Sequence, residues 1–268
     1  MFAVQASALA RVAVASLMDW PRLLSTNLGR SGGGASPASS SPPPPGLSKE
    51  AVLSEHAQQR CVAALRRLRP LRVDPAAVAR RAAVLVPLCL VGEDVCLLYT
   101  LRAAALRHYR GQVSFPGGMQ EAGDGGSLEA TALREAREEL GLAADGVRVW
   151  GHGPWVGTAR RDAAVLPFVG FVGRVDVRAL RLCPHEVEAA FAVPLQRLCD
   201  PKLFRYTQFR GSFALPVFTG GEYRIWGLTA IITHTVLKAL VPAVYTHHLP
   251  KEWLLEHPEG FTYDQFNA

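Results

Sequence analysis

Arg134-Glu135-Ala136-Arg137-Glu138-Glu139-Leu140-Gly141-Leu142, which follows Pro116-Gly117-Gly118, is the most informative stretch of this sequence. At about 3.6 residues per turn, Glu135, Glu138 and Glu139 stand at i, i+3 and i+4 and share one face of a helix. Like charges at this spacing destabilise an isolated helix, so the arrangement favours a divalent cation among the carboxylates. Their hard oxygen ligands suit Mg²⁺ or Mn²⁺.

The alternative interpretation is an ordinary solvated helix face, because runs rich in Arg and Glu usually face water. The surrounding residues favour a site. Gly117 and Gly118 precede the helix and allow the backbone to approach a ligand closely, and Gly141 ends it as a C-cap. The stretch therefore predicts a loop, a helix and a second loop, with a functional site where they meet.

The run resembles the Nudix box, G-x5-E-x7-R-E-U-x-E-E-x-G-U with U aliphatic. Its second half, Arg134 to Leu142, matches at each specified position. In the first half Asp124 stands where the family has Glu, and nine residues rather than seven separate it from Arg134. The resemblance implies an α/β fold, the Nudix α/β/α sandwich with a mixed β-sheet, and an enzyme that hydrolyses a diphosphate bond.

The loop before the helix is more similar to the coenzyme A branch of the family, which runs Phe-Pro-Gly-Gly-x-x-Asp-x-x-Asp and then Ala-Leu-Arg-Glu-Ala. The matching positions are Phe115, Pro116, Gly117, Gly118, Glu121, Asp124 and Ala132 to Ala136. This branch implies metal-dependent cleavage of coenzyme A or acyl-coenzyme A to adenosine 3′,5′-bisphosphate and a phosphopantetheine product. Upstream, Ala103 replaces a branch Ser and Tyr109 replaces a branch His.

The resemblance assigns roles within the box. Glu135 and Glu139 are the expected metal ligands, and Glu138 is either a third ligand or the base that acts on water. Arg134 would orient a glutamate through a bidentate contact. Gly118 would offer its backbone carbonyl to the metal, and the Gly117-Gly118 pair would let the backbone approach the bound substrate.

Further candidates lie outside the box. Glu186 is the candidate general base from a distant loop, with an ordinary exposed loop acid as the alternative. Arg102 holds a position in the coenzyme A signature that places it near the substrate's phosphates, and Arg107 and Arg110 would add positive potential. The alternative for these arginines is a solvated loop cluster.

Two other functions remain open from the sequence. One keeps the fold and changes the substrate to a nucleotide sugar, a dinucleotide such as NADH or an oxidised nucleoside triphosphate. The other is a degenerate Nudix module that binds without turnover. Nucleic-acid binding is not expected, because the net charge is only +6 and the basic residues are dispersed. The expected partner is a small molecule, and the oligomeric state stays open.

The chain begins with a segment unlike the rest. Residues 1–30 carry Arg11, Arg22 and Arg30 with Asp19 as the one acid, and apolar residues between them permit an amphipathic helix. This composition predicts a mitochondrial transit peptide and hence a mitochondrial location. A secretory signal is the alternative, but Arg11 interrupts its apolar core.

The next boundary is marked by composition. Residues 31–46 are nearly all Gly, Ser, Ala and Pro, which predicts a disordered linker. Residues 47–268 are assigned to the Nudix hydrolase domain, with a core at about 78–248. The 5 cysteines are odd in number and lack close pairs, so neither a disulfide framework nor a zinc site is expected.

Apolar patterning predicts the elements of this domain. Helices are expected over Lys49–Leu68, Ser127–Leu140 and Leu228–Leu240. Strands are expected over Ala82–Leu90, Val95–Thr100 and Val165–Val172, with a further strand after Glu186. Phe213–Phe218 and Glu222–Trp226, joined through Gly220-Gly221, predict a hairpin. The last helix contains His234 and Lys238, which favours a buried helix over a membrane span.

Overall fold

The computed structural model describes residues 44–106, 109–158, 162–208 and 214–249. The predicted transit peptide, residues 1–30, and residues 31–43 of the predicted linker lie outside these ranges. The described chain begins with a short 3-10 helix, η1 (Pro45–Leu47), whose Leu47 is buried. Leu47, the first residue of the predicted domain, is therefore part of the hydrophobic core.

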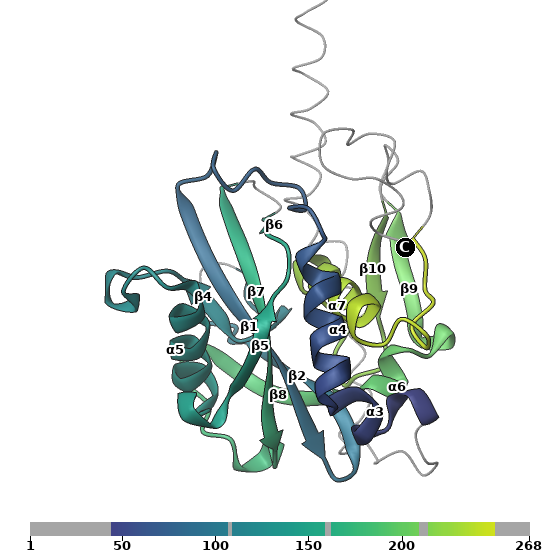
Figure 1. The fold of residues 1–268 in the computed structure, drawn as a ribbon. Helices are drawn as coiled ribbons and strands as arrows, with labels where there is room; N and C mark the ends of the chain where they lie inside the picture. The colour runs from purple at the N-terminus through teal and green to yellow at the C-terminus, as the bar shows by residue number, and fades with distance from the viewer. Residues whose placement is uncertain (1–43, 107–108, 159–161, 209–213, 250–268) are drawn as a thin grey trace, which may run out of the picture. The chain divides into compact units, whose positions relative to one another are not determined.

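A mixed β-sheet forms the centre of the fold (Figure 1). In the described ranges eight strands belong to it: β1 (Arg80–Val91), β2 (Asp94–Arg102), β3 (Val113–Ser114), β4 (Gly117–Met119), β5 (Arg148–His152), β6 (Val156–Gly157), β7 (Ala163–Arg174) and β8 (Val187–Pro194). The long strands β1 and β7 are parallel, whereas β1 is antiparallel to β2 and β4, and β2 is antiparallel to β3 and β8.

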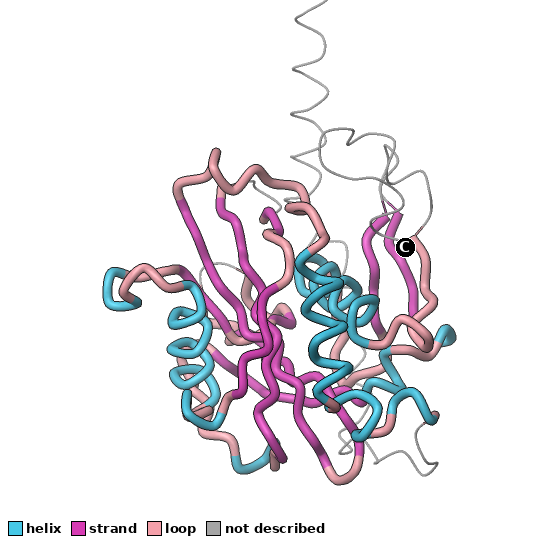
Figure 2. The backbone as a smooth tube through the Cα atoms, viewed as in Figure 1, coloured by secondary structure: helices cyan, strands magenta, loops and turns pink. Residues whose placement is uncertain are grey.

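Helices cover both faces of this sheet. The α-helices are α3 (Lys49–Leu53), α4 (Glu55–Arg66), α5 (Leu128–Leu140), α6 (Leu195–Leu198) and α7 (Gly227–Leu240), and the remaining 3-10 helices are η2 (Ala122–Asp124), η3 (Ala144–Gly146), η4 (Val177–Ala179) and η5 (Pro201–Leu203). Figures 1 and 2 show α5 on one side of the sheet and α4 with α7 on the other. The predicted α/β/α sandwich with a mixed sheet is confirmed.

The two-residue period of β1 explains the three layers. Val86 and Leu88 belong to the core that contains the buried residues of α4 and α7. Ala83 and Leu85 belong to a second core with Ala132 and Ala136 of α5. Because successive side chains of a strand point to opposite faces, one apolar strand can pack against both helical layers.

The predicted strands at β1, β2 and β7 and the helices at α5 and α7 are confirmed, with ends that differ by a few residues. The helix expected over Lys49–Leu68 is instead two helices, α3 and α4. Ser54 lies between them in extended conformation, with φ −63° and ψ 151°, and its hydroxyl accepts a hydrogen bond from the backbone N–H of Ala57. A serine N-cap thus ends one helix and begins the next.

The predicted hairpin was wrong in its partner strand. β10 (Ala214–Phe218) pairs with β9 (Phe204–Gln208), and Phe213 lies outside the described residues. The segment Glu222–Trp226 contributes only the bridge between Ile225 and Phe218. Gly221 packs against β8, where a Cβ at this position would meet Val193 at 2.7 Å.

Among the described residues no helix combines the length and apolar character needed to cross a membrane. α7 is instead a core element, with Ile231, Ile232, Val236 and Leu237 buried. The predicted buried helix is therefore confirmed.

Tyr99 joins several of these elements. Its fully buried ring stacks on Phe115, with ring centroids 4.8 Å apart, and on Phe191 of β8, with centroids 5.5 Å apart. The Tyr99 hydroxyl lies 3.1 Å from Oγ1 of Thr233 in α7. Thr233 already donates its hydrogen to the carbonyl of Thr229, so Tyr99 is the donor.

We expect Tyr99→Phe to lower the free energy of unfolding by about 1 kcal/mol, because the ring contacts stay and one buried hydrogen bond is lost. Urea denaturation measures this change. Tyr206→Phe is the matched control, since Tyr206 is 50% exposed; its effect should stay within about 0.5 kcal/mol. Equal losses in both variants would contradict the assigned hydrogen bond.

Candidate metal and diphosphate site

α5 presents the carboxylates of the predicted box. The Ser127 hydroxyl accepts a hydrogen bond from Ala130 N at the first turn, and Gly141, at φ 71°, ends the helix with its N–H donating to the carbonyl of Arg137. The apolar stripe Ala132, Ala136 and Leu140 packs on the sheet. Because this stripe faces the sheet, Glu135 and Glu139, which stand next to it on the helix surface, lie along the edge of the helix–sheet interface.

Two glycines of β4 allow close packing against β1 and against a carboxylate of α5, because they have no side chain. A Cβ on Gly117 would lie 2.4 Å from the carbonyl oxygen of Ala83 in β1, so this position is held by close strand packing. A Cβ on Gly118 would lie 2.2 Å from Oε1 of Glu135. The Glu135 carboxylate therefore lies directly against the Gly118 backbone, and the approach of this glycine pair to a ligand stays a prediction.

Glu186 reaches the same place from a distant part of the sequence. It directly precedes β8, whose pairing with β2 places Val187 opposite Arg102. The N–H of Ala103 donates to the Glu186 carbonyl at 2.8 Å, and the N–H of Cys183 donates to the Glu139 carbonyl at 3.1 Å. The turn that carries Glu186 is thus tied both to β2 and to the last turn of α5.

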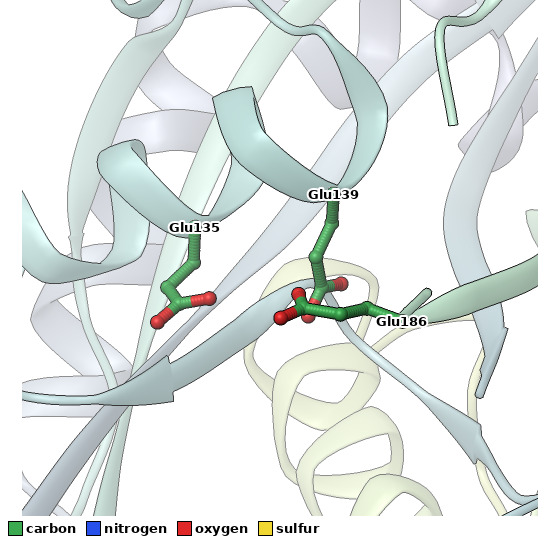
Figure 3. Close-up of side chains that lie close together, drawn as sticks. All are labelled: Glu135, Glu139 and Glu186. Carbon is green, nitrogen blue, oxygen red and sulfur yellow. The ribbon is translucent and has the colours of Figure 1, made fainter. Parts of the chain in front are cut away.

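The structure brings together the carboxylates of Glu135, Glu139 and Glu186 (Figure 3). One oxygen from each lies within 4.8 Å of the others. Glu139 is only 2% exposed, and Glu135 and Glu186 are half-buried. Three converging carboxylate oxygens form a donor set for a hard divalent cation.

The electrostatics of Glu139 favour that interpretation. Burial, together with the charges of Glu135 and Glu186, raises the pKa of Glu139 to about 8, although Arg102 and the backbone N–H of Gly117 oppose the shift. Burial likewise raises the pKa of Glu135, with Arg134 opposing it. A buried carboxylate beside two others is costly to ionise unless a cation is present.

Arg134 links these acids to the preceding loop. Its Nε donates to Oδ1 of Asp124 at 2.8 Å, and its Nη2 donates to the Met119 carbonyl at 3.1 Å. Its Nη1 donates to Oε1 of Glu135 and to Oε2 of Glu138, both at 3.0 Å. One guanidinium therefore fixes a loop carbonyl and three carboxylates at once.

Asp124 is the anchor that was absent from the predicted site. Its carboxylate is 6% exposed and accepts hydrogen bonds from Glu121 N at 2.8 Å and from Oγ1 of Thr131 at 2.7 Å, in addition to Arg134. The Arg134 guanidinium, helped by these two donors, holds the pKa of Asp124 well below its usual range. The signal for this role was its place as the acid of the box's first half.

The nine-residue spacing from Asp124 to Arg134 is also explained. Gly125 and Gly126 follow η2 with φ angles of 59° and 80°, and Ser127 then caps α5. The extra residues form a left-handed glycine turn between the acid and the helix. They leave the ion pair intact.

The other predicted site residues lie as follows. Glu138 is outside the carboxylate group and bonds to Arg134, with its side chain 48% exposed. Arg102 lies beside the group, with Nη1 3.9 Å from Oε1 of Glu139. Arg110 is exposed in the loop after β2, and Arg107 lies outside the described residues. The roles proposed for all of these residues stay predictions.

Comparison with known proteins agrees with this geometry. The family profile named NUDIX domain matches residues 79–214. Mitochondrial coenzyme A diphosphatase NUDT8 of Mus musculus is 44% identical over 200 residues, covering 72% of this chain and 92% of that protein. Its Homo sapiens counterpart of the same name is 43% identical over 200 residues, covering 70% and 84%.

A more distant relative is the peroxisomal coenzyme A diphosphatase NUDT7 of Mus musculus, 35% identical over 175 residues that cover 61% of this chain and 70% of that protein. The NUDIX match spans β1 to the start of β10 and includes each of the three converging carboxylates. Sequence, fold and site therefore agree, and the chain belongs to the Nudix hydrolase family.

Proposed function

We propose that this chain is a coenzyme A diphosphatase that hydrolyses coenzyme A or acyl-coenzyme A to adenosine 3′,5′-bisphosphate and phosphopantetheine or its acyl derivative. The observation that carries the reaction is the convergence of Glu135, Glu139 and Glu186. The substrate is supported by the names of relatives that are 43 and 44% identical over most of their length.

The donor set fits Mg²⁺ or Mn²⁺. All three groups are carboxylates, and among the described residues Oε2 of the buried Glu139 has no hydrogen-bond partner, so it retains a free acceptor for a cation. When bound there, such a cation supplies charge neutralisation at the phosphates and lowers the pKa of the attacking water. Glu135 and Glu139 are the residues that would hold it, and Glu186 lies beside them.

Residues around this donor set would orient its carboxylates and accept the proton of the attacking water. Arg134 holds Glu135 and Glu138 in fixed orientations through its Nη1. Because Glu138 is engaged there, we assign it a positioning role and assign the acceptance of the water proton to Glu186. Glu186 is half-buried at the end of a turn, where a carboxylate can exchange a proton with solvent.

We also assign the protein to mitochondria. Two of the relatives carry that location in their names, and residues 1–30 have the arginines and few acids of a transit peptide. Import of the full chain fused to a fluorescent protein tests the location, and a fusion that stays outside mitochondria would contradict it.

The substrate is tested by incubating the full chain with coenzyme A, acetyl-coenzyme A, a long-chain acyl ester, NADH and a nucleotide sugar under Mg²⁺ or Mn²⁺. Mass spectrometry should detect adenosine 3′,5′-bisphosphate from the coenzyme A compounds at the highest kcat/KM. Faster hydrolysis of NADH or the nucleotide sugar would contradict coenzyme A as the preferred substrate. If none of the compounds yields a product, the alternative of a non-catalytic binding module is favoured.

Glu139→Gln should lower kcat by about a hundredfold or more, because it removes a ligand charge from a site whose cation contributes several kcal/mol to catalysis. Thermal unfolding should show a folded protein, since glutamine keeps the shape of the side chain. Glu129→Gln is the matched control on the exposed first turn of α5 and should retain turnover. Near-normal kcat in Glu139→Gln at saturating metal would remove the proposed site.

The affinity for Mn²⁺ should rise between pH 6 and pH 8. Because the pKa of Glu139 is raised to about 8, the cation must displace a proton below that pH, and one proton released corresponds to about a tenfold gain in affinity per pH unit. The gain should level off above about pH 8. Calorimetric titration of metal-free protein measures it, and a flat profile in this range would contradict the assignment of Glu139.

The two glycines of β4 should respond differently to a methyl group. Gly118→Ala should leave the fold intact and weaken Mn²⁺ binding, because its Cβ meets the movable carboxylate of Glu135. Gly117→Ala should lower the free energy of unfolding, because its Cβ meets the main chain of β1. Calorimetry and urea denaturation on both variants measure the contrast, and similar profiles would contradict it.

A further inference from the structure

Arg102, at the end of β2, points a charged group at the most buried carboxylate of the site. Its Nη1 lies 3.9 Å from Oε1 of Glu139, and the two side chains are 25% and 2% exposed. This separation is too long for a hydrogen bond, so the contact is one of charge alone. Arginine keeps its proton in proteins, and the positive charge is therefore permanent.

Both members of this pair retain hydrogen-bonding capacity. Within the residues that the structure describes, neither Nε of Arg102 nor Oε2 of Glu139 has a hydrogen-bond partner, although both atoms are buried. Buried polar atoms of this kind are costly and call for a partner. The Arg102 guanidinium can donate to an anion and the Glu139 carboxylate can bind a cation. A divalent cation bound together with a diphosphate would satisfy both groups.

The backbone at Arg102 is fixed on both sides. Its N–H donates to the Gln112 carbonyl at 3.0 Å, and its own carbonyl accepts from Gly111 N at 2.9 Å. The next residue, Ala103, donates to the carbonyl of Glu186. Any change in what Arg102 contacts must therefore come from rotation of its long side chain.

We propose that Arg102 is a positioning residue that holds its positive charge beside Glu139 until a divalent cation enters, and that then turns its donors to the anionic substrate. The cation and the substrate thereby bind in a coupled manner. This inference rests on the proposed function, since it takes the carboxylate group as the cation site and a diphosphate as the substrate.

The sign of the effect follows from the charges. Where Glu139 is already ionised, a permanent positive charge beside the cation site repels the cation and attracts the anion, so Arg102 should then weaken binding of metal alone while strengthening binding of substrate. A single charge about 6 Å from a divalent cation, screened as in water, corresponds to about a tenfold change in affinity. Loss of an active-site residue would then improve metal binding.

The test is calorimetric titration of Mn²⁺ into the metal-free full chain at pH 9, so that displacement of a proton from Glu139 does not mask the effect of the Arg102 charge. Arg102→Gln should bind Mn²⁺ about tenfold more tightly than the wild type, Arg102→Lys should stay close to the wild type, and Arg102→Met should repeat the result if Arg102→Gln is poorly folded. Arg60→Gln is the matched control, because Arg60 is exposed on α4, across the sheet from α5, and loses the same charge. Its affinity for Mn²⁺ should not change.

Steady-state kinetics provides the second measurement. At saturating Mn²⁺, Arg102→Gln should raise KM for coenzyme A, and Arg102→Lys should recover part of the loss. Unchanged or weaker Mn²⁺ binding in a folded Arg102→Gln or Arg102→Met variant would overturn the inference and leave the metal site standing. Failure of the proposed function has a different signature, namely Mn²⁺ binding that is the same in wild type and Glu139→Gln.

Discussion

Asp124 and Arg134 form an ion pair that fixes the position of the loop before α5 relative to the helix. The pair is largely buried, and each partner has further hydrogen bonds that satisfy it, to Thr131 and the Glu121 N–H on one side and to Met119 on the other. Breaking a buried pair by removing one partner leaves an uncompensated charge. The orientation of Glu135 depends on this contact, because Arg134 holds both residues.

The second constraint comes from the sheet. β2 and β8 are far apart in sequence, yet their pairing places Glu186 beside Arg102 and opposite the last turn of α5. The site is thus assembled at a junction of a helix, a glycine strand and a strand end. A junction of this kind can hold several like charges, because the surrounding core fixes the elements that carry them.

Much of this could be predicted from local sequence. The ends of α5 followed from Ser127 and Gly141, and the strands at β1 and β2 followed from their apolar runs. Ser54 was missed as a break, because a serine within a helical pattern is also compatible with a continuous helix. The predicted hairpin was wrong because β10 pairs with the preceding strand, β9. Turn residues alone do not predict which strands pair.

The site was predicted in its residue types better than in its geometry. Glu135, Glu139 and Glu186 were all proposed from the sequence, but only tertiary structure could show that their oxygens converge and that Glu138 instead bonds to Arg134. The pairing of Asp124 with Arg134 required the turn between them to be known. Distances across a fold depend on packing that no single stretch contains.

That turn has a consequence for how such enzymes are recognised. Gly125 and Gly126 take up the two additional residues on the surface while Asp124 and Arg134 keep their contact, so the number of residues between them can vary without moving the chemistry. A fixed interval in a sequence pattern therefore measures the length of a turn. The diagnostic property is a buried acid that meets the arginine at the start of the glutamate run, and chains with longer or shorter intervals can share it.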